Sequence, residues 1–166
     1  FLGLCFGMQL AVVEFYRNVL GLKAASSTEL DPQTKYPVIH IIPEQKRNLK
    51  LRAYGGTMRL GSWDCRVQPG TIAFTAYKTK DTSERHRHRY EVNEAYVAQL
   101  EAKGLVISGR SVKENLVEII ELPSNLHPFF LGTQGHPEYK SRPLSPHPIF
   151  LKYIQACSER SRGVKS

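Results

Sequence analysis

The stretch GLCFGMQ, residues 3–9, follows the apolar residues Phe1 and Leu2 and leads into LAVVEFYRNVL, a segment typical of a helix. Cys5 has one glycine two residues before it and another two residues after it. A residue at the tip of a tight strand-to-helix turn is strained, and small neighbours relieve the crowding around it. The start of a helix also favours a thiolate over a thiol. The pattern predicts a nucleophile with a depressed pKa at Cys5, although a core cysteine flanked by loop glycines fits the same letters.

Working outward, apolar residues recur at helical spacing from Met8 to Val19, and Gly21 follows where a helix would end. Asn93 is expected to cap a helix over 94–103 that stops at Gly104, and Ser145 a final helix over 146–157 with Pro146 in its first turn. A loop is predicted at 26–36, a hairpin at 54–67, and strands at 37–42, 71–77, 105–109, 116–122 and 128–134. An apolar strand that feeds a helix at the start of the chain indicates an α/β fold.

Composition sets the class of protein. The 166 residues, with 41% hydrophobic and 23% charged residues, suit one globular domain. The net charge of +8 is spread along the chain, so we expect no nucleic-acid partner. No apolar run is long enough to span a bilayer, and no membrane association is expected. An odd count of three cysteines argues against a disulfide scaffold and favours a reducing, cytoplasmic setting.

A partner for Cys5 follows the last predicted strand, in GHPEYKSRP (135–143). His136 and Glu138 are two residues apart, so both side chains would leave an extended segment on the same side. A histidine that acts as a base needs a second group to fix its tautomer, and a glutamate can do so. The residues therefore permit a Cys5, His136, Glu138 triad, whereas HPE alone is also typical of a solvated turn.

GLCFGMQ together with the later GHPEY resembles the class I glutamine amidotransferases. The stretches SSTELDP (26–32), GGTMRLG (55–61) and RHRHRYEVN (85–93) are similar to the glutaminase domains of CTP synthases within that family. The resemblance implies a flavodoxin-like three-layer sandwich, with a central, mainly parallel sheet and added antiparallel strands. It also implies an amidotransferase domain over residues 1–156, with a basic tail at 157–166.

The resemblance further implies roles for single residues. Cys5 would attack the side-chain amide of L-glutamine, with His136 moving the proton and Glu138 orienting His136. The backbone N–H of Phe6 would bind the oxyanion, and Gly7, Met8 and Gln9 would lie at the glutamine pocket. Glu29 would receive the α-ammonium group of the substrate, and Arg89 its α-carboxylate. No metal or cofactor is expected in this domain.

What the resemblance implies beyond this chain is a synthase domain on the same polypeptide, which aminates UTP with ATP and Mg²⁺. GTP is expected as an effector, and a homo-oligomer as the assembly. Phe6 replaces the usual leucine of the motif, and the glycine loop that supplies a second oxyanion donor has no counterpart here. We therefore expect the N-terminal part of the domain to be absent from the chain.

Other functions fit some of the same residues. A partial amidotransferase could serve as a non-catalytic or regulatory interface, and glutamine-dependent ammonia release would distinguish it from an enzyme. A Cys-His hydrolase of γ-glutamyl peptides would share the turn around Cys5, but it would not be expected to carry RHRHRYEVN. The alternating RHRHR could also be a strand with solvated arginines on one face and His86 and His88 on the other.

Overall fold

The computed structural model describes residues 1–41 and 58–163. The last residue of the predicted strand 37–42, the first residues of the hairpin predicted at 54–67 and of GGTMRLG, and the end of the basic tail lie outside these ranges.

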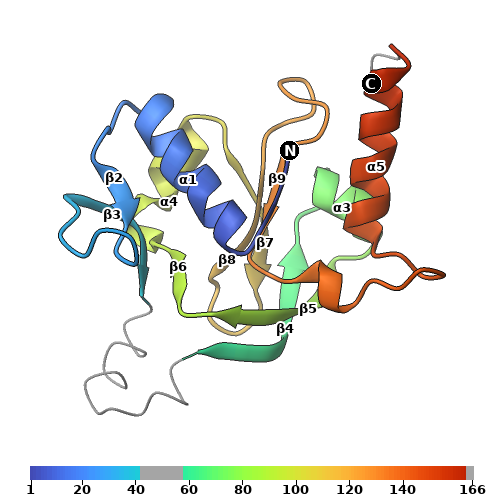
Figure 1. Ribbon diagram of the computed structural model, residues 1–166, viewed down its shortest axis with the longest axis horizontal. Coiled ribbons are helices and arrows are strands. Elements are labelled where there is room, and N and C mark those ends of the chain that lie inside the picture. The colour runs from blue at the N-terminus through green and yellow to red at the C-terminus, as the bar shows by residue number, and fades with distance from the viewer. Residues whose placement is uncertain (42–57, 164–166) are drawn as a thin grey trace.

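A six-stranded mixed sheet forms the centre of the molecule (Figure 1). Its strand order is β1 (Leu2–Leu4), β9 (Leu131–Thr133), β8 (Val117–Glu121), β7 (Val106–Ser111), β4 (Arg59–Val67) and β5 (Asp81–His88). Only the β1 and β9 pair of this sheet is parallel in the part of the chain that the structure describes, so a mainly parallel sheet was the wrong expectation for it. The reason lies in the connections: β7, β8 and β9 follow one another through loops without a crossover helix, which parallel pairing requires.

A smaller sheet lies beside the first one and contains β2 (Ala25–Ser27), β3 (Tyr36–Ile41) and β6 (Tyr90–Val92). The chain passes from β5 in the large sheet to β6 in the small sheet with Arg89 alone between them. Arg89 therefore lies at the junction of the two sheets.

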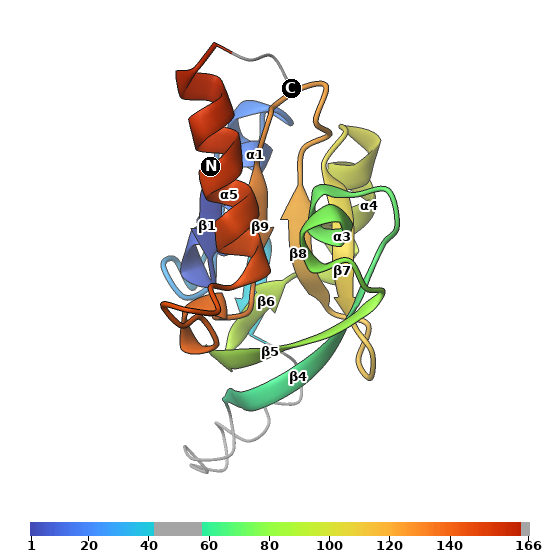
Figure 2. The ribbon, with the colours of Figure 1, turned by 90° about the vertical axis from the view of Figure 1, so that its right-hand side faces the viewer.

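Helices cover both faces of the large sheet, as the views in Figures 1 and 2 show. On one face lie α1 (Phe6–Asn18) and α4 (Glu94–Ala102), and on the other lie α3 (Ile72–Tyr77) and α5 (Pro148–Ser161). Ile120 packs into the core under α1 and α4, whereas the adjacent Ile119 packs into the core under α3 and α5. The alternating side chains of β8 thus serve two cores, which gives the expected three-layer α/β sandwich.

Several predicted elements are confirmed. Helix α1 ends near Gly21, which has a φ of 77°, and the Asn93 side chain accepts a hydrogen bond from the Ala95 N–H at the start of α4. Gly104, with a φ of 89°, follows α4 as expected. The strands at 105–109, 116–122 and 128–134 are present as β7, β8 and β9.

The segment 71–77 is a helix, where a strand was predicted. The Thr71 hydroxyl accepts a hydrogen bond from the Phe74 N–H at 3.0 Å. The Glu121 carboxylate accepts two more, from the N–H groups of Ile72 at 2.7 Å and Ala73 at 3.1 Å. These acceptors satisfy the free donors of the first turn, and Glu121 comes from β8, far along the sequence.

Two further predictions are corrected. The described part of 54–67 is one long strand, β4, which pairs with β5, and not a hairpin. The last helix begins at Pro148 and not at Pro146, because the His147 side chain and not Ser145 accepts a hydrogen bond from the N–H of Ile149. Helix α5 continues to Ser161, so the first part of the predicted tail is helical.

Candidate active site

Cys5 lies at a sharp turn between β1 and α1. Its φ of 49° and ψ of −104° are unusual for a residue with a side chain. The turn is held by the Cys5 N–H, which donates to the Thr133 carbonyl at 2.7 Å, and by the Gln9 N–H, which donates to the Cys5 carbonyl at 3.2 Å. The predicted strained turn is confirmed, and it joins the start of α1 to the end of β9.

The two glycines that flank Cys5 differ in how closely other atoms pack against them. A Cβ atom on Gly3 would lie 2.9 Å from the carbonyl carbon and oxygen of Gly7, so only glycine fits at residue 3. A Cβ on Gly7 would meet no atom within 4 Å, so the packing does not require a glycine there. The close approach is thus between the strand at Gly3 and the backbone of the helix at Gly7.

The first turn of α1 presents backbone donors beside Cys5. The N–H groups of Phe6, Gly7 and Met8 precede the first intrahelical donor, Gln9, and so have no acceptor within the helix. The Phe6 side chain is exposed, whereas the Met8 side chain is buried in the core. Any contact of Met8 with a substrate would therefore use its backbone.

The pKa of the Cys5 thiol is raised from its ordinary value, contrary to the depressed pKa predicted from the sequence. Burial is the main cause, because it disfavours the thiolate. The nearby carboxylates of Glu91 and Glu138 raise the pKa further, while hydrogen bonds from the Phe6 N–H and from Gln134 oppose them. Desolvation thus outweighs the two influences from which the sequence predicted a depressed pKa, the helix start and His136.

His136 and Glu138 form a pair, as predicted, but on a different backbone. Residues Pro137–Tyr139 form a 3₁₀ helix that begins at His136, so the segment is not extended. The turn still brings His136 Nδ1 to 2.6 Å from Glu138 Oε1. Because a carboxylate accepts hydrogen bonds, Nδ1 carries a proton and donates a hydrogen bond to Glu138. In the neutral imidazole, Nε2 is then the nitrogen that can accept a proton. Nε2 is buried and has no hydrogen-bond partner in the described part of the chain.

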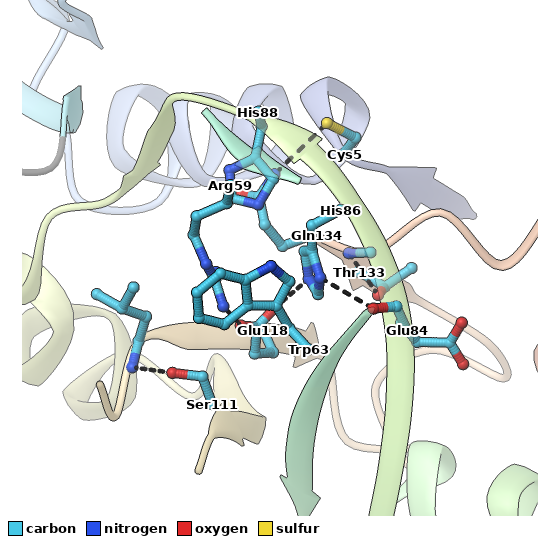
Figure 3. A network of polar contacts seen from close by, with 12 residues as sticks. Cys5, Arg59, Trp63, Glu84, His86, His88, Ser111, Glu118, Thr133 and Gln134 are labelled. Atoms are coloured by element: carbon cyan, nitrogen blue, oxygen red, sulfur yellow. Dashed lines mark hydrogen bonds and ion pairs between the residues drawn. The ribbon is translucent and has the colours of Figure 1, made fainter. Parts of the chain in front are cut away.

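Gln134, which the motifs did not single out, lies near Cys5 (Figure 3) and links Cys5 to Gln9 through its side-chain amide. Its Nε2 donates to Cys5 Sγ at 3.5 Å, and its Oε1 accepts from Gln9 Nε2 at 3.1 Å. Gln9 Nε2 also donates to the carbonyl of Tyr90 at 2.8 Å. In the sequence, the signal that could have identified Gln134 was a polar residue at the end of an apolar strand. The structure shows that this glutamine is fully buried.

Glu29 and Arg89 both influence the electrostatics of Tyr90. Glu29 is exposed and follows β2, and Arg89 precedes β6. Burial first, and then the charge of Glu29, raise the pKa of Tyr90, whereas the charge of Arg89 lowers it. Both charges therefore act on Tyr90, the residue whose carbonyl accepts a hydrogen bond from Gln9.

Behind the site, β4, β5, β6 and β8 contribute a buried polar network, part of which Figure 3 shows. Arg59 binds the carboxylates of Glu91 at 2.9 Å and Glu118 at 2.8 Å, and His86 Nε2 lies 2.7 Å from Glu118. Trp63 stacks on the guanidinium at 4.5 Å. The network fixes β5, the strand that carries RHRHR up to His88. The predicted alternation holds along β5, where His86 and His88 are buried and Arg85 and Arg87 are exposed, but Arg89, beyond the strand, is half-buried and not the third solvated arginine.

His88, at the end of β5, is held in its neutral form. Burial, and then the charges of His86 and Arg59, lower the pKa of His88 to about 2. Its Nδ1 donates to the Tyr90 carbonyl at 3.0 Å, the same carbonyl that accepts from Gln9. The neutral His88 ring therefore stabilises the junction of the two sheets through its hydrogen bond to the Tyr90 carbonyl.

Residues 1–41 and 58–163 contain no group of three or more His, Cys, Asp or Glu side chains placed to hold a metal ion. Over the same ranges, no helix is both long enough and apolar enough to cross a membrane.

Known proteins resemble this chain in both sequence and structure. The CTP synthase of Pelotomaculum thermopropionicum is 61% identical over 156 residues, which are 94% of this chain and 28% of that relative. The CTP synthase of Pyrobaculum calidifontis is 58% identical over 164 residues, which are 98% of this chain and 30% of that relative. The chain thus spans less than a third of the length of these curated relatives.

Among solved structures, the glutaminase domain of Trypanosoma brucei CTPS with bound acivicin matches with a TM-score of 0.86 and 36% identity, over 95% of this chain and 60% of that chain. A solved structure from Thermoplasma acidophilum matches with a TM-score of 0.60 at 16% identity, which shows the fold alone. The model of the family Glutamine amidotransferase class-I matches residues 1–156. A family model that covers nearly the whole chain, with a strained Cys5 turn and a His136–Glu138 pair within it, shows that the chain belongs to the class I glutamine amidotransferases.

Proposed function

We propose that this chain is the glutaminase part of a CTP synthase, which hydrolyses L-glutamine and supplies the ammonia for the amination of UTP to CTP. The observation that carries the proposal is the polarity of the His136 ring. Nδ1 is bound to Glu138, and the buried Nε2 has no partner in the described residues. An imidazole with a free acceptor, on the segment that Gln134 ties to a cysteine, suits proton transfer from a thiol.

In the first step, Cys5 Sγ attacks the side-chain amide carbon of glutamine, and His136 Nε2 accepts the thiol proton. Burial raises the pKa of the Cys5 thiol, so the resting group is a thiol and needs this base. Glu138 stabilises the imidazolium that forms, because its carboxylate already binds Nδ1. The backbone N–H of Phe6 donates to the oxyanion of the tetrahedral intermediate.

In the second step, the His136 imidazolium returns its proton to the leaving nitrogen, and ammonia departs from the tetrahedral carbon. A γ-glutamyl thioester then remains on Cys5. Water attacks the thioester carbonyl and gives its proton to His136. The new tetrahedral intermediate collapses with cleavage of its C–S bond, His136 returns the proton to the Cys5 thiolate, and glutamate is released.

We assign the substrate's α-ammonium group to Glu29 and its α-carboxylate to Arg89, and we place Gly7, Met8 and Gln9 along the pocket. A guanidinium can bind a carboxylate through two parallel hydrogen bonds. The amination of UTP, with ATP and Mg²⁺, belongs in this proposal to a synthase domain on the same polypeptide. GTP as an effector, a homo-oligomeric assembly and a cytoplasmic location complete the proposal.

The test uses the intact polypeptide, meaning this chain together with the sequence that accompanies it in the cell. Cys5→Ala and His136→Ala should each abolish CTP formation from glutamine and leave CTP formation from added ammonia unchanged, because both residues act only in ammonia release. Equal loss of the ammonia-supported reaction in a folded variant would contradict the assignment. Unchanged glutamine-dependent turnover in both variants would also contradict it, whereas absence of glutamine-dependent ammonia release from the unaltered polypeptide would favour the non-catalytic interface.

A further inference from the structure

A buried carboxylate that the mechanism does not use, Glu84 on β5, lies behind the segment that carries His136. Its side chain is only 3% exposed. Oε1 accepts hydrogen bonds from the Tyr77 hydroxyl at 2.9 Å and from His147 Nε2 at 2.7 Å. Because His147 Nδ1 accepts from the Ile149 N–H at 3.3 Å, its proton lies on Nε2 and points to Glu84.

These contacts join three elements at one residue. Tyr77 is the last residue of α3, and His147 caps the N-terminus of α5. The rings of Tyr77 and His147 also meet edge to face, with centroids 5.6 Å apart. Glu84 therefore fixes the position of both helices relative to β5.

The segment 135–147, which carries His136 and Glu138, contacts Glu84 at both of its ends. At its start, a Cβ on Gly135 would lie 2.7 Å from Glu84 Cβ, so the backbone before His136 rests directly on that side chain. At its end, His147 binds the Glu84 carboxylate. Figure 2 shows this segment, in orange and red, beside β5.

Neighbours of Glu84 on β5 hold the middle of the segment. The His136 N–H donates to the carbonyl of Arg85 at 2.8 Å, and Lys140 Nζ donates to the carbonyl of Ser83. Contacts to three consecutive residues of one strand leave the imidazole little freedom to shift. Of these three residues, Glu84 is the one that contacts the segment 135–147 through its side chain.

We propose that Glu84 is a positioning residue for the active site: held by Tyr77 and His147, it sets the place of His136 relative to Cys5. The inference rests on the proposed function, because it assumes that His136 transfers the proton. A small displacement of a proton-transfer group lowers the rate of the chemical step more than substrate binding, since the rate depends steeply on the geometry of the reacting atoms.

The experiment compares glutamine hydrolysis by variants of the intact polypeptide. Glu84→Ala should lower kcat by roughly tenfold or more and leave KM for glutamine within about twofold. Glu84→Gln should retain most of the wild-type kcat, because its amide oxygen still accepts from Tyr77 and His147. Asp81→Ala is the matched control: it lies on the same strand, and its ion pair with Arg66 is exposed, so kcat should not change.

Tyr77→Phe keeps the test decisive if Glu84→Ala does not fold, because it removes one hydroxyl and one hydrogen bond to Glu84; it should lower kcat by a smaller factor at constant KM. The inference is overturned if folded Glu84→Ala and Tyr77→Phe keep the wild-type kcat, or if their effect is confined to KM. An equal loss in Glu84→Gln would also overturn it, because charge rather than placement would then matter. Failure of the proposed function is distinguishable, since Cys5→Ala and His136→Ala would then keep glutamine turnover.

Discussion

At the scale of single residues, the thiol of Cys5 shows how burial and local donors compete. The helix start and the Phe6 N–H favour the thiolate, but desolvation is larger, and the pKa rises. The resting Cys5 is therefore a neutral thiol, while His136 Nε2 has no hydrogen-bond partner in the described part of the chain. In the proposed mechanism, the thiol would then ionise only when the substrate arrives.

We expect the alkylation of Cys5 by iodoacetamide, a small electrophile without the substrate's charges, to accelerate with pH and not to level off by pH 9.0, the ordinary pKa of a thiol. Peptide mapping at each pH would give the rate at Cys5, with Cys5→Ser as the control for the other thiols. Glu138→Gln should move the profile to lower pH, because the Glu138 charge raises the Cys5 pKa. A plateau reached by pH 9.0 would contradict the raised pKa.

At the scale of elements, the contact between β1 and α1 sets the geometry of the turn. Gly3→Ala should destabilise the fold by about 1–3 kcal/mol, because its Cβ would lie 2.9 Å from the Gly7 backbone, which cannot move without shifting the helix. Gly7→Ala is the matched control and should be neutral or stabilising by up to ~1 kcal/mol, because its Cβ meets open space within a helix. Urea unfolding of both variants would measure the difference, and equal destabilisation by both would refute this account.

The elements also show what sequence reasoning can and cannot reach. The cap at Asn93 and the apolar strand that ends at Gln134 were predictable, because their signals are local. Helix α3 was not, because the carboxylate that binds its first N–H groups belongs to Glu121 on another strand. The Cys5, His136 and Glu138 set is a prediction from motifs, whereas Gln134 and Glu84 were missed because burial and contacts between strands define them.

At the scale of the whole molecule, the candidate site is assembled from both sheets. Cys5 and His136 follow strands of the large sheet, Glu29 follows a strand of the small one, and Arg89 lies where the chain crosses between them. The buried network around Arg59 and the neutral His88 hold that crossing in place.

Arg89→Ala should therefore raise KM for glutamine by roughly ten- to a hundredfold, because it removes a charged hydrogen bond made equally in the ground and transition states. The matched control is Arg87→Ala, an exposed arginine two residues earlier on β5, which should leave KM unchanged. Steady-state hydrolysis of glutamine by the intact polypeptide measures both. A fall in kcat with an unaltered KM would exclude Arg89 as the carboxylate site.

If the proposed substrate contacts hold, we expect the side chain of Gln9 to make the site selective for substrate length. One amide nitrogen holds the Tyr90 carbonyl, next to Arg89, and the same nitrogen holds Gln134, which in turn contacts the sulfur of Cys5. Side-chain hydrogen bonds, and not a loop, thus connect the backbone next to Arg89, the proposed carboxylate site, to the sulfur of Cys5. Asparagine, one methylene shorter than glutamine, would leave its amide carbon short of the sulfur when its carboxylate is bound, and so would occupy the pocket without reacting.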